Sequence, residues 1–177
     1  MGLAFVGGVH GVGKSTACVE VASAMGLRVH TASAVIRSER ELPDSDQGKL
    51  VADVKANQRL LIRGVRKRLA EGPGLQILDG HFALRTLDGS IECIGVDVFD
   101  QLCVQTFVCY QDDPAAILRR LRERDAGSST VAEIAALQDA EIRHAKLVAR
   151  RLSRPLHLLM AFDSESLKRL LARAINE

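Results

Sequence analysis

A run of glycines closed by Lys14 and Ser15 constrains the fold of this chain more than any other feature. From Gly8 the sequence reads G-x-x-x-x-G-K-S, the pattern of a phosphate-binding loop, or P-loop. A short apolar run, residues 3–6, precedes the loop and fits a buried strand, and residues 16–25 continue it as a helix. Strand, glycine loop and helix in this order form the context that the pattern needs. A glycine-rich turn with a chance Lys-Ser pair is the weaker interpretation.

The residue types of this loop explain how it would hold phosphate. Glycines let the backbone curl so that successive N–H groups point at phosphate oxygens, and the following helix adds the positive end of its dipole. Lys14 would reach the β- and γ-phosphates, and the Ser15 hydroxyl would ligate Mg²⁺. The residues expected to contact the phosphates of ATP are Gly8, Gly11, Val12, Gly13, Lys14, Ser15 and Thr16.

The rest of the chain alternates between short apolar runs and helical segments. Four further strands are predicted at residues 28–31, 75–79, 104–110 and 156–160, and a small hairpin at residues 82–93. Helices are predicted at residues 33–37 with Ser33 as the cap, 48–71, 96–102, 113–124, 130–153 with Thr130 as the cap, and 163–175. This alternation predicts an α/β fold of three layers, in which helices cover both faces of a five-stranded parallel sheet. With 177 residues the chain is expected to form one domain, residues 1–177, with its ligand beyond the carboxyl ends of the strands.

Composition excludes several classes of function. The 24 basic and 22 acidic residues leave a net charge of +2, which is too even to argue for nucleic acid. No apolar run reaches the roughly 18 residues that cross a bilayer, and no targeting segment is visible. The four cysteines form no C-x-x-C pair and are interpreted as reduced thiols. We therefore expect a cytoplasmic protein without a membrane or nucleic-acid partner; the sequence leaves its oligomeric state open.

Two further features have the chemistry that a phosphate site needs. Asp79 ends a predicted apolar strand, where a carboxylate could hold Mg²⁺ directly or through water, although it could also cap the next turn. Arg120 and Arg124 share one face of a predicted helix that leads into a short loop, within a predicted lid at about residues 119–130. A solvated basic helix face is the alternative for these arginines. Lys14, Asp79, Arg120 and Arg124 are the residues expected to act in phosphoryl transfer.

Taken together, these motifs resemble the nucleoside monophosphate kinases, and most of all the archaeal type of adenylate kinase. Residues 79–86, DGHFALRT, are similar to the D-T-H-x-x-I-K-T segment of that family, and residues 120–124, RLRER, fit its R-L-x-x-R at the start of the lid. Residues 31–37 are similar to the acceptor segment S-T-G-D-M-L-R of bacterial relatives, with Arg37 as the clear match. The resemblance covers most of the chain and implies a P-loop kinase fold, with helices of the acceptor side at about residues 31–71.

The resemblance also implies an activity. It implies transfer of the γ-phosphate of ATP, with Mg²⁺, to a nucleoside monophosphate or similar small molecule held by Arg37, His81 and Arg85. Ser33 and Ala34 stand where that family has glycine and aspartate, and residues 95–98 replace its proline-rich turn. Because these departures surround the acceptor side, the resemblance bears more strongly on ATP as donor than on AMP as acceptor.

Several alternatives stay open at this stage. His81 could hydrogen-bond the acceptor or a phosphate, or only hold its loop in place, and Asp79 could serve as a base if the acceptor is an alcohol. The chain could be a kinase for a nucleoside or another small alcohol, or a nucleotide-binding regulatory ATPase or switch. Neither asparagine, Asn57 or Asn176, forms the N-K-x-D that reads guanine, so a GTPase is disfavoured.

Overall fold

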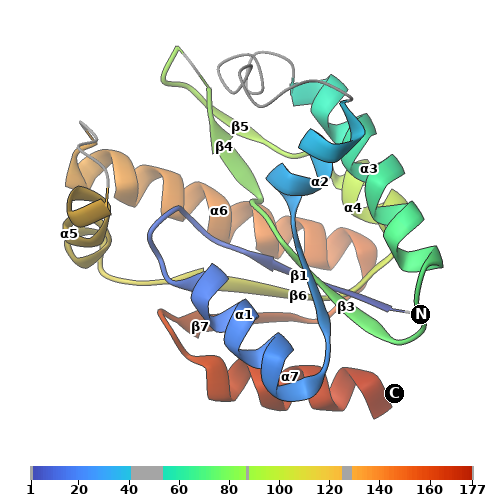
Figure 1. The fold of residues 1–177 in the computed structure, drawn as a ribbon. Coiled ribbons are helices and arrows are strands. Elements are labelled where there is room, and N and C mark those ends of the chain that lie inside the picture. The colour runs from blue at the N-terminus through green and yellow to red at the C-terminus, as the bar shows by residue number, and fades with distance from the viewer. Residues whose placement is uncertain (1, 41–53, 87, 125–128, 177) are drawn as a thin grey trace.

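The computed structural model describes residues 2–40, 54–86, 88–124 and 129–176. Five parallel strands form the central sheet in the order β2-β3-β1-β6-β7 (Figure 1). The strands of this sheet are β1 (Gly2–Gly7), β2 (Arg28–Thr31), β3 (Leu75–Asp79), β6 (Val104–Gln111) and β7 (Leu156–Met160). The predicted α/β fold with a five-stranded parallel sheet is confirmed, and the bounds of β2, β3 and β7 agree with the sequence-based ranges.

Helices cover both faces of this sheet (Figure 1). Four helices share one hydrophobic cluster on one face: α2 (Ala32–Glu39), α3 (Val54–Ala70), α4 (Val96–Gln101) and α6 (Val131–Leu152). The other cluster joins α1 (Lys14–Met25), α5 (Pro114–Arg124) and α7 (Ser164–Asn176). A two-stranded antiparallel hairpin, β4 (Ala83–Arg85) with β5 (Ile91–Cys93), lies outside the main sheet where the sequence predicts it.

The alternation of β1 explains how one strand serves both clusters. Leu3 and Phe5 point toward the face that α6 covers, while Ala4 and Val6 point toward α1 and α7, and all four are buried. Phe5 contacts three other phenylalanine rings at centroid distances of 4.9 to 6.3 Å: Phe82, Phe99 and Phe107. This aromatic group packs the strand that leads into the glycine loop against the start of the hairpin.

One helix start differs from the sequence-based expectation, and another agrees with it. Ser33 was expected to cap the helix after β2, but the structure shows that Thr31 does so, because its hydroxyl accepts the backbone N–H of Ala34 at 3.3 Å. The prediction for Thr130 holds, and Thr130 and Glu133 form a complete capping box at the start of α6.

Two predicted segments are described only in part. The long helix predicted over residues 48–71 is α3, which the structure describes from Val54, and residues 48–53 lie outside the described range. Of the predicted lid, residues 125–128 lie outside it as well. Across the described ranges, no helix combines the length and the apolar character needed to cross a bilayer.

Candidate active site

The glycine loop leaves β1 and enters α1 with a backbone that two positions restrict to glycine. Gly8 has a φ of 134°, and a Cβ added there would lie 2.7 Å from the carbonyl oxygen of Tyr110. Gly13, the N-cap of α1, has a φ of 95°, and its added Cβ would meet the ring of Phe162. Other residues are strained at such φ values, and here they would also clash with neighbouring atoms. The loop is therefore fixed by its surroundings as well as by its sequence.

Lys14, Ser15 and Asp79 meet at the carboxyl ends of two neighbouring strands. β1 pairs with β3 so that Val6 lies beside Asp79, which brings the strand-end carboxylate next to the start of α1. The Lys14 Nζ lies 3.6 Å from Asp79 Oδ1, and the Ser15 hydroxyl donates to Asp79 Oδ2 at 2.5 Å. Lys14 and Asp79 are 5% and 6% exposed, so the pair lies in an environment where charge–charge interactions are strong.

These groups fit a magnesium ion. The Ser15 hydroxyl and the Asp79 carboxylate are hard oxygen ligands, and their contact shows that both oxygens can be directed at one point. When bound, Mg²⁺ would supply positive charge that neutralises charge developing on the phosphates. Within the part of the chain that the structure describes, the side chains of Ser15 and Asp79 would hold the metal.

His81 joins the loop after β3 to α6. Its Nδ1 lies 2.9 Å from Oε1 of Glu141, whose Oε2 accepts the backbone N–H of Phe82 at 2.6 Å. Burial raises the pKa of the Glu141 carboxyl to about 8, and burial, followed by the charge of Lys14, lowers the pKa of His81 to about 3. At neutral pH the pair therefore shares one proton between a carboxyl oxygen and an imidazole nitrogen, with no net charge.

His10, within the glycine loop, packs against this pair. Its ring centroid lies 4.4 Å from that of His81. Burial, followed by the proximity of His81 and Lys14, lowers the pKa of His10 to about 3, so both rings are neutral at pH 7. The contacts of His81 with Glu141 and His10 support the interpretation that His81 holds its loop; its role toward an acceptor stays a prediction.

The two lid arginines face different surroundings. The Arg120 guanidinium donates to the carbonyl of Gly11 at 2.8 Å and to Asp112 at 2.6 Å, and lies 5.2 Å from the centroid of the Phe162 ring. Arg124, one turn further along α5, is exposed, and its charge is one of those that lower the pKa of His10. α5 therefore places Arg120 against the glycine loop, while Arg124 acts on His10 of that loop through its charge.

Of the three predicted acceptor residues, His81 lies beside this centre, whereas Arg37 and Arg85 lie on other elements, α2 and β4. Arg85, on β4, donates to the Glu133 carboxylate at 2.6 Å and so connects the hairpin with the start of α6. Arg37 lies on the exposed surface of α2. The structure thus brings Lys14, Ser15, Asp79 and His81 close together, while Arg85 is already paired with a carboxylate of the chain itself.

Sequence reasoning missed three residues of this site. Glu141 and Glu133 lie within a helical pattern in which a glutamate is usually solvated. The packing of α6 against the hairpin buries Glu141 and pairs the partly exposed Glu133 with Arg85. Phe162 follows β7 without any motif. The single available signal was Glu133, which stands three residues after Thr130 as a capping box requires.

Fold and site together define a P-loop protein of the three-layer α/β class. Residues 7–138 match the AAA domain model, about three quarters of the chain, and the chain belongs to that family. A search of curated proteins finds no match.

Among solved structures, the chain resembles a gluconokinase from Sinorhizobium meliloti 1021 with a TM-score of 0.59 and 17% identity, over 99% of this chain and 94% of that one. It also resembles a shikimate kinase from Bacteroides thetaiotaomicron with a TM-score of 0.60 and 17% identity, over 99% of both chains. At this identity the two structures show the fold alone, which is that of the P-loop kinases. The archaeal adenylate kinase type stays a prediction.

Proposed function

We propose that this chain is a kinase that transfers the γ-phosphoryl group of ATP, with Mg²⁺, to a small-molecule acceptor. One observation carries the proposal: Lys14 and Ser15, at the start of α1, both contact Asp79 at the end of β3. A lysine for the phosphates, and a hydroxyl and a carboxylate for the metal, are the parts that phosphoryl transfer needs from a P-loop protein. Membership of the AAA domain family and the kinase fold of the two solved structures support it.

The residues of the donor site would act by position and charge. The N–H groups of the loop would hold the phosphate oxygens, and Lys14 would neutralise charge on the transferring group. Arg124 lies where it could approach the same group. The exposed ring of Phe162 and the Arg120 guanidinium, both beside the loop, offer a flat surface on which a nucleobase could stack.

For the acceptor, we propose the adenylate kinase type, with a nucleoside monophosphate as first candidate. Arg37 and Arg85 would bind its phosphate, because a guanidinium offers paired donors that match phosphate oxygens. Arg85 would have to exchange Glu133 for the acceptor. That ion pair favours a second candidate, a small alcohol, since an acceptor without a phosphate would leave the pair intact. The names gluconokinase and shikimate kinase of the two similar structures point the same way.

An acceptor screen tests the proposal. Release of ADP from Mg-ATP would be followed with nucleoside monophosphates, nucleosides and small hydroxy acids, each at the same concentration, with the Lys14→Ala variant as the blank. We expect ADP release that depends on one class of acceptor and disappears in the variant. Slow release that is indifferent to every acceptor would replace the kinase with a regulatory ATPase or switch.

A further inference from the structure

The sheet ends at β7 with one edge of backbone groups that pair with no other described strand. The Pro155 carbonyl accepts Phe107 N–H, and Ala161 N–H donates to the Gln111 carbonyl, so both of these groups face β6. Because facing groups alternate along a strand, His157 and Leu159 also face β6. The N–H and C=O groups of Leu156 and Leu158 and the N–H group of Met160 therefore point away from the sheet and pair with no other described strand, whereas the Met160 carbonyl accepts the Asp163 N–H at 3.2 Å.

The side chains of the same residues form an apolar surface beside this edge. Leu159 belongs to the cluster on the α7 face, so alternation places Leu156, Leu158 and Met160 on the α6 face. Leu158 is 38% exposed and Met160 is 54% exposed, which means that α6 does not cover this end of the sheet. The opposite edge strand, β2, has no large exposed apolar residue. An uncharged, apolar edge is the kind that pairs with another chain.

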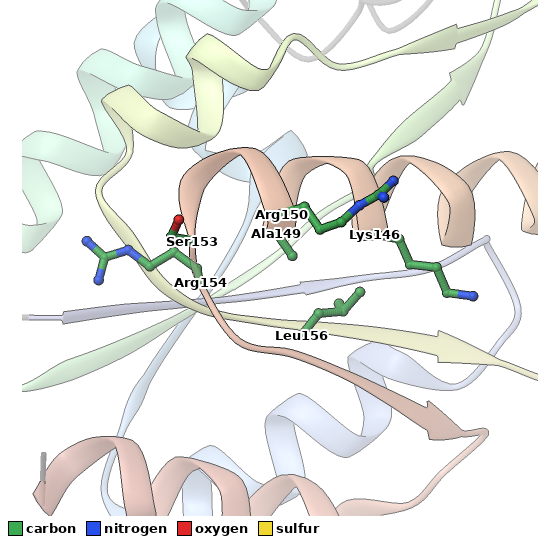
Figure 2. A pocket seen from close by; sticks show the side chains of 6 residues that line it. All are labelled: Lys146, Ala149, Arg150, Ser153, Arg154 and Leu156. Carbon is green, nitrogen blue, oxygen red and sulfur yellow. The ribbon is translucent and has the colours of Figure 1, made fainter.

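Cations line the pocket where α6 meets this strand. The pocket, about 650 Å³ in volume, is lined by Lys146, Ala149, Arg150, Ser153, Arg154 and Leu156. Figure 2 shows the Leu156 side chain on β7 directed at α6, with Lys146 to one side of it and Arg154 to the other. None of the three cations forms an ion pair with any residue in the described ranges.

The segment of the chain that lines this pocket has basic residues but no acidic ones. From Ile142 to Phe162 there are five arginines and lysines and no aspartate or glutamate. The dipole of α6 favours cations in its last turn, which accounts for Arg150. It does not account for Lys146, a turn earlier, or for Arg154, beyond the end of the helix.

We propose that this surface, formed by the β7 edge and the pocket cations Lys146, Arg150 and Arg154, binds an extended acidic segment of another protein. The segment would pair with β7 as a sixth strand through the backbone groups of Leu156, Leu158 and Met160. Its apolar side chains would cover Leu158 and Met160, and its carboxylates would meet the three cations. Backbone pairing gives affinity in such strand addition, while charge complementarity selects the partner.

The test uses two labelled peptides on the full chain. In the acidic decapeptide, glutamate alternates with valine; in the control, lysine alternates with valine. NMR titration should show saturable shifts of the Leu156, Leu158 and Met160 amides with the acidic peptide and none with the basic one. The double variant Arg150→Glu with Arg154→Glu should weaken binding at least about tenfold. Leu158→Pro, which removes an outward N–H and no bond to β6, should abolish it.

Further variants at Leu158 and a turnover control separate a loss of peptide binding from a loss of folding. Leu158→Val, which keeps the N–H group, should bind normally. Leu158→Glu, whose carboxylate would repel the acidic peptide, replaces the proline variant if that one fails to fold. ATP turnover should be unchanged in all of these variants. Equal binding of both peptides, or no shift up to millimolar peptide, would overturn the proposal. So would a dimer in sedimentation that Leu158→Pro abolishes, or binding to vesicles rich in phosphatidylserine in the absence of peptide binding.

Discussion

The proposed donor and acceptor sides of this molecule differ in how their charged side chains are paired. On the donor side, Lys14 and Ser15 are adjacent in sequence, and both contact the buried Asp79 carboxylate. They follow a loop whose backbone tolerates only glycine at Gly8 and Gly13. On the acceptor side, cations come from separate elements and pair with the chain's own carboxylates, as Arg85 does with Glu133 and Arg63 with Glu39. The first arrangement is ready for phosphate, whereas the second requires an exchange of partners before Arg85 can bind a ligand.

The largest effect that would test this contrast is expected at Lys14. Lys14→Ala should lower turnover by roughly 10²-fold or more, because it removes the charge that stabilises the transferring phosphoryl group. Steady-state ADP release measures it, with circular dichroism to verify the fold. Lys168→Ala, an exposed lysine on α7, is the matched control and should keep the normal rate. Near-normal turnover in Lys14→Ala would remove the donor side from the mechanism.

The buried Glu141 carboxyl should make the free energy of unfolding depend on pH. The folded chain keeps the Glu141 proton up to a pKa of about 8, while the unfolded chain releases it near the ordinary 4.5. Between these two pKa values the folded state binds more protons than the unfolded state, so the free energy of unfolding falls as pH rises. The decrease is about 2 kcal/mol between pH 6.5 and 8.5. Urea unfolding at both pH values measures the slope.

The Glu141→Gln variant tests that explanation, since an amide does not titrate. Its stability should change much less over the same pH range, whereas Glu20→Gln, at an exposed position of α1, should keep the slope of the unmodified chain. An unchanged slope in Glu141→Gln would show that the buried pair with His81 does not hold the proton.

On the acceptor side, Arg85→Ala should raise the KM for a monophosphate acceptor roughly tenfold, with the Kd for ATP unchanged. The lost contact is a charge-assisted hydrogen bond, made equally in ground and transition states. A drop in ATP affinity would assign Arg85 to the donor side. No change in either constant would favour the small alcohol, and Glu133→Gln should then also leave the KM as it is.

The smallest effect is expected along α5. Arg124→Ala should lower kcat severalfold, by about one charge-assisted contact at an exposed site, whereas Arg122→Ala should leave it unchanged. Of these two arginines, only Arg124 has a charge that lowers the pKa of His10 in the glycine loop. Equal effects of the two substitutions would identify them as general surface charge.

The sequence predicted the sheet, the glycine loop and the place of Asp79 because each depends on local pattern. Apolar runs of strand length and glycine spacing are visible in a window of a few residues. The partners of His81 and Arg85 depend on how α6 crosses the hairpin, which no local pattern records. Thr31 caps the helix in place of Ser33 because α2 begins at Ala32, directly after β2 ends at Thr31, a boundary that sequence-based ranges give only approximately.

Tyr110 gives the molecule a spectroscopic property. The chain has one tyrosine and no tryptophan, so its intrinsic fluorescence comes from a single ring. The carbonyl of Tyr110 lies under Gly8 at the start of the glycine loop, while its hydroxyl donates to the Asp163 carbonyl at 2.9 Å, just before α7. The emission of Tyr110 should therefore respond both to changes in the glycine loop and to the packing of α7. Titration with nucleotide and unfolding by urea can both be followed in the unlabelled protein at that one residue.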